Sequence, residues 1–314
     1  MTPFLLQAAT TEPPLEQSKL VLLGALAIFA VGHAIQMVTR VIRLRGATAA
    51  SEPGMPGDSP AVTPTQLGVG FVTNFFDTLG IGSFATSTSI FRFTRSVPDE
   101  RIPGTLNVGH AIPAMLQAFI FTQVVPVEAT TLFLMIGAAI IGAWTGAGIV
   151  AGLPRRQVQI GMGVCLTGAA LLMMSSLFNW TPTGGDAFAL TGTKLAIGVG
   201  TNFVLGVLMT LGIGLYAPCM IAVSMLGMNP TSAFPIMMGS CAFLMPVAGR
   251  RFVLKGSLAS GTSLALTLGG IPAVLIAAYI VKSLPLTAVK WLVVVVVLYT
   301  AAGLLRSAMR KAEA

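Results

Sequence analysis

The chain has 314 residues, of which 54% are hydrophobic and only 9% are charged, whereas an ordinary soluble domain has about a quarter of its residues charged. This composition argues against a soluble enzyme, and the high hydrophobicity argues against a disordered chain in spite of 35 Gly and 19 Pro. Membrane helices tolerate Gly and Pro because neighbouring groups satisfy the freed backbone. The net charge of +8 comes from basic residues that lie singly or in pairs between apolar runs, which is typical of topology signals and not of nucleic-acid binding. We therefore predict an all-α polytopic membrane protein.

The start of the chain and its cysteines give no sign of secretion or of metal binding. Residues 1–17 lack the positive region of a secretory signal, and the apolar run 20–38 ends in arginines, so this run is predicted to be an uncleaved transmembrane helix. Cys165, Cys219 and Cys241 all lie in apolar stretches. Such an odd, unclustered set predicts neither a disulfide framework nor a zinc site, and we interpret these cysteines as packing residues.

Seven apolar runs approach or exceed the length of about 20 residues that a spanning helix needs. They are residues 20–42, 104–125, 127–150, 158–178, 233–249, 257–281 and 286–305. Two further stretches, 65–93 and 193–226, are too long for one simple crossing, and each has a Gly-x-Gly near its middle. Residues 46–63 are rich in Ala, Ser, Pro and Gly and are predicted to be a polar linker.

The chain repeats itself at a constant, ungapped offset. The pentapeptide Thr-Leu-Gly-Ile-Gly occurs at 78–82 and again at 210–214, an offset of 132, and two prolines of the first half recur at the same offset. This register predicts an internal duplication. The predicted organisation is an N-terminal segment with an extra helix (1–45), a cytoplasmic linker (46–63), repeat 1 (64–178), an extracytoplasmic linker (179–195), repeat 2 (196–308) and a cytoplasmic tail (309–314).

The distribution of basic residues predicts how the repeats run. If each Gly-x-Gly stretch enters the membrane and returns to the same side, each repeat has three crossings and the second repeat is inverted. With the N-terminus outside, 14 Lys and Arg then lie on the cytoplasmic side and 4 lie outside. If the stretches cross instead, the division is 10 to 8. The positive-inside rule favours the inverted arrangement, with the C-terminus in the cytoplasm, while full crossing by a long kinked helix stays open.

Each Gly-x-Gly is predicted to break a helix at membrane depth. The 15 residues 65–79 span about 22 Å as a helix, which is less than the bilayer core of about 30 Å. The next half-helix begins near Ser83, so its free amide groups and its positive dipole end point into the membrane interior. Two such ends, one from each repeat, would form a site for a small oxyanion near the midplane. The alternative is that these glycines only permit close helix packing.

The candidate substrate-binding residues are those at the two breaks and those expected to reach the same depth. They are Gly80, Ile81, Gly82, Ser83, Thr86, Ser87, Asn107, His110, Gly212, Ile213, Gly214, Tyr216, Cys219, Gly239 and Ser240.

At these residues the chain resembles a known family. Residues 68–91, with a Gly-rich break followed by small residues, and the Pro-containing loop 97–103 are similar to the TauE/SafE family of sulfite exporter-type membrane permeases. The second half, 200–223 followed by 229–233, is more similar still, with Ala-Pro at 217–218 after the glycines.

The resemblance covers residues 64–305 and departs from the family in two ways. The breaks read Gly-Ile-Gly-Ser and Gly-Ile-Gly-Leu, where the family often has three successive glycines, and the helix at 20–42 is extra. The first departure leaves the choice of anion open. What the resemblance implies is export of sulfite or a short organosulfonate such as sulfoacetate across the bacterial inner membrane, whereas the residues alone indicate an anion carrier.

Asp77 is the one acidic residue well inside an apolar segment, and the second repeat has Met209 at the matching position. Intramembrane carboxylates are costly and usually functional, so coupling to protons or sodium is one hypothesis. The other is that the carboxylate holds the shape of the break through hydrogen bonds.

Asn107 and His110 are spaced to lie on one face of a helix, near the depth of the first break. His110 could donate to an anion or carry a proton in coupling, or it could be a packing residue. Asn107 has small or polar counterparts in the second repeat, Gly239 and Ser240. His33, Asn74 and Asn202 are expected to be structural. Arg92, Arg95, Arg250, Arg251 and Lys255 are expected to anchor topology, with attraction of anions as an alternative.

The predicted protein is a secondary transporter and not an enzyme. Its expected partners are a small anion and the lipid bilayer, with proton or sodium coupling, no cofactor, no metal and no nucleic acid. The sequence has no G-x-x-x-x-G-K-[ST] motif, which excludes a P-loop ATPase in this chain. The rival functions are an anion channel, an uptake permease for sulfate, thiosulfate or another anion, and a membrane enzyme, for which the chain offers few clustered ligands.

Overall fold

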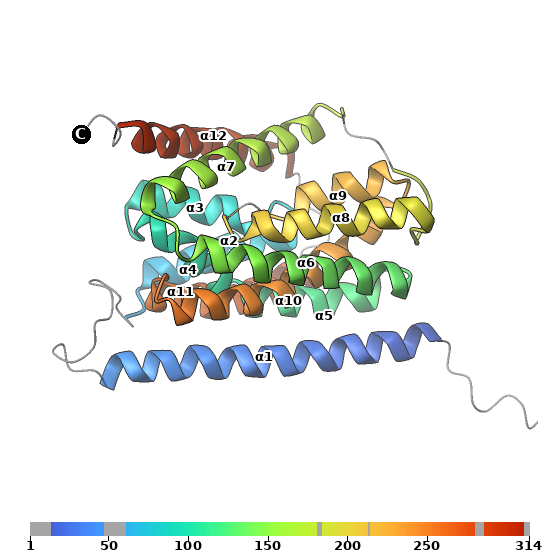
Figure 1. The fold of residues 1–314 in the computed structure, drawn as a ribbon, viewed down its shortest axis with the longest axis horizontal. Coiled ribbons are helices and arrows are strands. Elements are labelled where there is room, and N and C mark those ends of the chain that lie inside the picture. Colours follow the sequence, from blue (N-terminus) through green and yellow to red (C-terminus); the bar gives the residue numbers. More distant parts are fainter. Residues whose placement is uncertain (1–13, 47–60, 181–183, 213, 280–285, 311–314) are drawn as a thin grey trace, which may run out of the picture.

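A computed structural model describes residues 14–46, 61–180, 184–212, 214–279 and 286–310 (Figure 1). These residues form helices and connecting turns without a β-strand, which confirms the predicted all-α class. The helices are α1 Pro14–Gly46, α2 Pro64–Thr78, α3 Ser83–Thr94, α4 Ile102–Gly109, α5 Ala111–Val124, α6 Ala129–Val150, α7 Arg155–Leu177, α8 Gly192–Met209, α9 Tyr216–Met225, α10 Ala233–Leu254, α11 Ser260–Tyr279 and α12 Leu286–Arg310, with 3-10 turns η1 Asp99–Arg101 and η2 Pro230–Ser232. Ile213, most of the linker 46–63 and the last four residues lie outside the described ranges.

Six helices in the described part of the chain are long and apolar enough to cross a membrane. They are Leu20–Leu44, Ala129–Val150, Arg155–Leu177, Gly192–Met209, Pro230–Leu254 and Ser260–Tyr279. Their outward faces carry exposed aliphatic side chains, such as Ile28 on α1 and Ile141 on α6, as lipid-facing surfaces do. This agrees with the predicted multi-pass membrane protein.

The expectation of one continuous crossing at residues 104–125 is wrong. The segment forms two helices, α4 and α5, that meet at His110. Pro113 has no N–H, so the carbonyl of Gly109 lacks its helical donor; Thr267 Oγ1 on α11 donates to it instead, at 2.8 Å. In contrast, α8 is long enough to cross by itself, although the sequence predicted it as half of a broken stretch.

Both long stretches break where the sequence predicts. Residues 65–93 form α2 and α3, and residues 193–226 form α8 and α9. The predicted start of the second half-helix at Ser83 is confirmed. Gly80, Gly82 and Gly212 have φ of 88°, 91° and 98°, a region that side-chain-bearing residues rarely enter. The breaks therefore depend on glycine conformation.

The helices of the first half recur in the second half at nearly constant spacing. For example, α3 begins at Ser83 and α9 at Tyr216, 133 residues later, and α6 begins at Ala129 and α11 at Ser260, 131 residues later. In the same way α2 corresponds to α8, α4 and α5 together to α10, and α7 to α12. The 3-10 turns η1 and η2 occupy equivalent places.

Helices of each half pack against helices of the other half. Helix α2 packs along α11, α8 packs along α6, and α7 packs along α12. Glycines permit the close approaches: a Cβ added at Gly206 of α8 would lie 2.2 Å from the carbonyl oxygen of Ala139, and one at Gly269 of α11 would lie 2.2 Å from that of Leu67. Neither half therefore packs as an independent unit.

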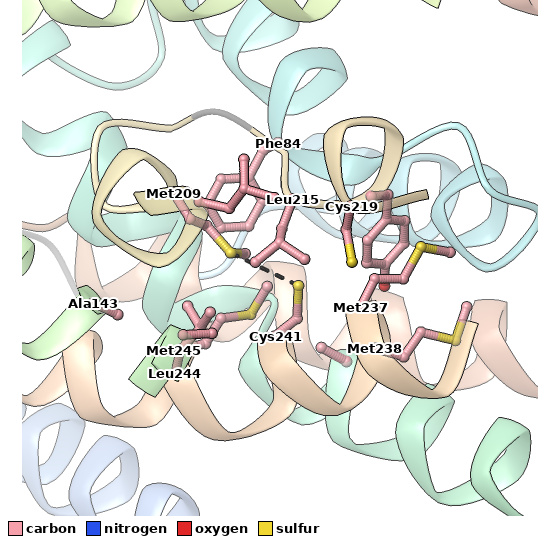
Figure 2. Packing of buried hydrophobic residues seen from close by; sticks show 14 of the residues in the cluster. Phe84, Ala143, Met209, Leu215, Cys219, Met237, Met238, Cys241, Leu244 and Met245 are labelled. Carbon is pink, nitrogen blue, oxygen red and sulfur yellow. Dashed lines mark hydrogen bonds between the residues drawn. The ribbon is translucent and has the colours of Figure 1, made fainter. Parts of the chain in front are cut away.

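Helix α10 lies at the centre of the bundle and α1 at its edge. The spanning window of α10 is 89% buried and that of α1 is 22% buried. Figure 2 shows the methionines and cysteines around α10, where Cys241 Sγ lies 3.7 Å from Met209 Sδ. Helix α1 runs along one side (Figure 1), held by His33 Nε2 at 3.0 Å from the carbonyl oxygen of Val108. This contact agrees with the structural role expected of His33.

Basic side chains from several helices collect at one end of the bundle. Each contacts the end of another helix there: Arg40 Nη1 donates to Val253 O at 3.1 Å, Arg92 Nη2 to Ser307 Oγ at 3.3 Å, Arg156 Nε to Ala308 O at 3.1 Å and Lys255 Nζ to Gly148 O at 2.9 Å. Another set of contacts joins turns elsewhere, where Glu128 N donates to Phe188 O at 2.9 Å and Ser232 Oγ to Pro126 O at 3.1 Å.

Candidate functional site

The two glycine breaks meet inside the molecule through a buried polar network. Tyr216, the first residue of α9, places its hydroxyl 2.5 Å from Gln117 Oε1 on α5 and 3.3 Å from Asp77 Oδ2 on α2. Gln117 Nε2 donates to Asp77 Oδ2 at 2.9 Å and to Thr78 Oγ1 at 3.0 Å. The network thus joins the second break to the residues that precede the first break.

Asp77 caps the helix that follows its own break. Its Oδ1 accepts a hydrogen bond from the backbone N–H of Ser83, the first residue of α3, at 2.5 Å. Asp77 is only 4% exposed, and a carboxylate at a helix N-terminus satisfies a free amide and complements the helix dipole. The sequence analysis predicted that this amide would bind the substrate anion. In this structure it donates to Asp77 instead, and that hydrogen bond stabilises the turn between α2 and α3.

A small cavity of about 30 Å³ lies between the two breaks. Ile81 and Gly82 line it from the first break, and Gly214 and Tyr216 line it from the second. The remaining wall is apolar and comes from Ala85, Pro218, Ala169, Ala170, Met173, Val294 and Val297. Since a water needs roughly 10–15 Å³ of such space, the cavity has room for about two waters. None of its described lining residues is basic, and Tyr216 is the one among them with a polar side chain.

His110 connects the two helices of the first break and does not line the cavity. Its Nδ1 lies 3.0 Å from Asn74 Oδ1 on α2, and its Nε2 lies 3.0 Å from Ser87 Oγ on α3. Asn74 Nδ2 donates to Gly70 O at 2.7 Å; its Oδ1 is therefore the acceptor for His110 Nδ1. Asn74 lies one turn before the end of α2 and Ser87 one turn after the start of α3. Both ring nitrogens thus hold these helices together.

Two more candidates have side chains directed at neighbouring backbone. The hydroxyl of Thr86 lies 3.1 Å from Gly82 O and 2.9 Å from Ser83 O within its own helix. Asn107 Nδ2 donates to Pro103 O at 2.9 Å, and its Oδ1 has no hydrogen-bond partner among the described residues. Neither residue lines the cavity between the breaks.

Cys219 on α9 and the candidates on α10 belong to helix packing. Cys219 is buried in the cluster of Figure 2. Ser240 Oγ accepts from Asn202 Nδ2 at 2.9 Å, and the same amide donates to Met135 O at 2.6 Å. A Cβ added at Gly239 would meet Ile136 at 2.7 Å. These contacts join α8, α10 and α6, as expected of Asn202, and they lie outside the cavity lining.

The sequence analysis did not predict Gln117, nor the residues of α7 and α12 that line the cavity between the breaks. Gln117 is fully buried within an otherwise apolar stretch of α5, and a buried amide in such a stretch is a signal for a polar partner. The walls from α7 and α12 consist of Ala, Met and Val, which give no signal in a sequence of this composition.

Chemically, the arrangement offers a buried carboxylate, a phenol, an amide and two glycine-rich turns around a small cavity. It can hold a proton at Asp77, and it can offer the Ser83 amide and the Tyr216 hydroxyl to an oxyanion when the carboxylate withdraws. Comparisons of the chain with protein-family models, with curated proteins and with solved structures gave no match.

Proposed function

We propose that this protein is a secondary transporter that exports a small sulfur oxyanion, sulfite or a short organosulfonate such as sulfoacetate, across the bacterial inner membrane by alternating access. The observation that carries the proposal is the meeting of the two breaks, with Tyr216 of one bonded to the Asp77–Gln117 pair of the other beside a cavity that both breaks line. The sulfur-oxyanion class rests on the resemblance of residues 64–305 to the TauE/SafE family.

The contacts of His110 support a re-entrant hairpin at the first break. In a helix that ran straight through, Asn74 and Ser87 would be separated by roughly 20 Å. A single imidazole ring contacts both, at 3.0 Å on each side, which requires α2 and α3 to fold back on each other. Figure 1 has α3 and α9 toward opposite halves of the molecule, as expected for hairpins that enter from opposite sides.

The basic end of the bundle supports inverted repeats with the N-terminus outside. In the crossing alternative, residues 92–101 lie on the opposite side of the membrane from residues 250–255. Ser257 Oγ donates to Glu100 O at 3.2 Å, and Arg92 and Arg156 reach the end of α12. These contacts support the 14-to-4 distribution of basic residues, which places the arginines in the cytoplasm.

The position of Asp77 suggests how transport is coupled. An oxyanion bound at the start of α3 needs the Ser83 amide, which donates to the Asp77 carboxyl group in this structure. Two anions cannot share that amide, because their repulsion in a water-poor site is strong. Protonation of Asp77 removes one charge and releases the amide, so the anion and a proton bind and cross together. Export by such a symporter is driven by the outward gradient of the anion and not by an inward proton gradient. Since the cavity has room for about two waters, the tips of the breaks must separate when the anion enters.

The test is flux of radiolabelled sulfite and sulfoacetate into proteoliposomes with and without a pH gradient. Asp77→Asn is expected to abolish the stimulation by the gradient while substrate exchange persists, and Asp186→Asn, at an exposed carboxylate, should behave as wild type. Tyr216→Phe removes one donor worth about 1 kcal/mol and is expected to weaken substrate binding about fivefold. Gradient-driven flux that survives in Asp77→Asn would overturn the coupling role.

Transport kinetics in the same proteoliposomes distinguish a carrier from a channel. The cavity's small size favours a carrier, for which we expect saturable counterflow of labelled sulfite against unlabelled sulfite. Passive, ohmic current would instead identify a channel. A thermal-shift series over sulfite, sulfate, thiosulfate and short sulfonates then identifies the substrate, and no shift or flux with any of them would reject the sulfur-oxyanion assignment.

A further inference from the structure

A second, much larger cavity of about 940 Å³ opens at the basic end of the bundle. It lies where the last turn of α3 meets the start of α7 and the second half of α12, and it shares no lining residue with the cavity between the breaks. Its volume is within the range of ligand pockets, roughly 300–1,000 Å³.

The lining of the cavity has an excess of positive charge. Arg92, Arg95 and Arg155 line it together with one carboxylate, Asp99. Asp99 is buried and accepts from Arg92 Nη1 at 2.5 Å and from Gln159 Nε2 at 2.7 Å, and Arg155 Nη2 lies 3.5 Å away. Arg155 Nε also lies 3.5 Å from Glu100 Oε2, so three guanidinium groups against the two carboxylates of Asp99 and Glu100 leave a net charge of +1. Asp99 orients Arg92 and Arg155, while Arg95 makes no ion pair among the described residues.

The lining also includes apolar side chains that are exposed at the surface of the bundle. Phe93 is 83% exposed, Tyr299 is 74% exposed, and Ile90 beside them is half-buried. Tyr side chains are enriched at the level of lipid headgroups, and Phe93 adds exposed apolar surface to the same lining. The ligand that fits this cavity therefore carries an anionic group beside an apolar chain.

We propose that this cavity binds an acidic phospholipid, with its headgroup phosphate on Arg95 and Arg155 and an acyl chain against Phe93 and Tyr299. Arginines form charge-assisted hydrogen bonds with phosphate oxygens, and basic pockets between membrane helices on the cytoplasmic side bind acidic headgroups. A free anion explains the arginines but not the exposed aromatic side chains at the mouth. The lipid would bridge α3 of the first half to α12 of the second half.

The experiment measures lipid binding to the purified full chain in detergent by native mass spectrometry and by thermal shift. The probes are dioleoylphosphatidylglycerol, dioleoylphosphatidylcholine with the same acyl chains, and glycerol 1-phosphate, which has the headgroup phosphate without the chains. We expect saturable binding of the phosphatidylglycerol with a rise in Tm, and weaker binding of the other two. Equal affinity for both lipids, or glycerol 1-phosphate binding as tightly as the acidic lipid, would overturn the proposal.

Arg95→Gln tests the cavity directly, since Arg95 is exposed and its substitution leaves the Asp99 contacts intact. One arginine near an acidic headgroup contributes about 1 kcal/mol, so affinity for phosphatidylglycerol should fall about fivefold, and Arg95→Lys should recover most of it. The matched control is Arg306→Gln, an exposed arginine on α12 that does not line the cavity. Unchanged Tm without added lipid shows that the variants fold, and an equal loss in the control would reject the assignment.

Discussion

At the scale of single residues, the buried polar side chains explain how so apolar a chain reaches one defined structure. An unpaired polar group costs several kcal/mol in a medium without water, so few pairings are compatible with burial. Asp77, Gln117 and Tyr216 satisfy one another from three different helices. Each of them has partners only when its helix is in place, so this network specifies the position of both breaks.

Glu128 provides a prediction at this scale. Its carboxylate caps α6 by accepting from the amides of Thr130 and Thr131, both at 2.7 Å. Burial raises the pKa of Glu128, but the hydrogen bonds from Thr131 and Thr130 outweigh it and lower the pKa from 4.5 to about 2. The stabilisation is therefore present above pH 4.5 and is lost as the pH falls toward 2.

Glu128→Ala is expected to lower the stability at pH 7 by about 0.5–2 kcal/mol, the usual cost of losing an N-cap. The difference in Tm between variant and wild type should shrink when thermal unfolding is followed in detergent at pH 3. The control for the loss of a negative charge is Asp186→Asn, because Asp186 is exposed and does not cap a helix. A difference that is constant from pH 7 to pH 3 would contradict the role of the ionised cap.

At the scale of helices, the glycines divide into two kinds. Gly80, Gly82 and Gly212 allow the backbone to turn through positive φ, whereas Gly206 and Gly269 allow a neighbouring helix to approach. Glycines that end helices and glycines that permit close packing are therefore both present, at different positions. The first kind ends helices, and the second kind brings α8 to α6 and α11 to α2.

Gly206→Ala and Gly200→Ala, both on α8, separate packing from helix propensity. The new Cβ at position 206 would lie 2.2 Å from Ala139 O, whereas at position 200 it meets nothing within 4 Å. We expect Gly206→Ala to destabilise by about 1–3 kcal/mol through overpacking and Gly200→Ala to be neutral or stabilising by up to about 1 kcal/mol. Thermal unfolding of both variants in detergent measures this, and equal Tm values would refute the packing role.

At the scale of the molecule, helices of two similar halves pack against each other. Helix α2 packs on α11 and α8 packs on α6, so the first helix of each half is covered by the other half. These contacts join residues far apart in sequence, and such contacts form late because long loops must close first. The half-chain 64–178 is not expected to fold alone.

The orientation of this molecule gives a prediction for the whole chain. With the buried Cys165, Cys219 and Cys241 replaced by alanine, single cysteines are introduced at the exposed Ser96 and Asp186. A membrane-impermeant maleimide added to intact cells should label Asp186→Cys, and it should label Ser96→Cys only after the cells are opened. The crossing alternative predicts the reverse result for both positions.

Much of the fold could be predicted because its causes are local. Apolar length identified most of the long helices, and the pentapeptide at 78–82 and 210–214 located both breaks, since glycine conformation is a property of the residue itself. Hydropathy alone predicts one helix over 104–125, since it takes no account of the N–H that Pro113 lacks. That Thr267 donates to the carbonyl freed by this proline follows only from the approach of α11.

The sequence by itself determined the membrane class, the positions of the breaks and the presence of a carboxylate, Asp77, inside an apolar segment. The tertiary structure alone decided that Asp77 caps α3, that Gln117 and Tyr216 complete its hydrogen bonds, and that Thr86, Cys219 and Gly239 lie away from the cavity. The physical reason is that helix formation and helix breaks depend on neighbouring residues and on the solvent. Which side chains meet depends on how helices distant in sequence pack. A sequence made largely of Ala, Gly, Leu and Val does not predict which helices pair, because these residues can pack in many ways.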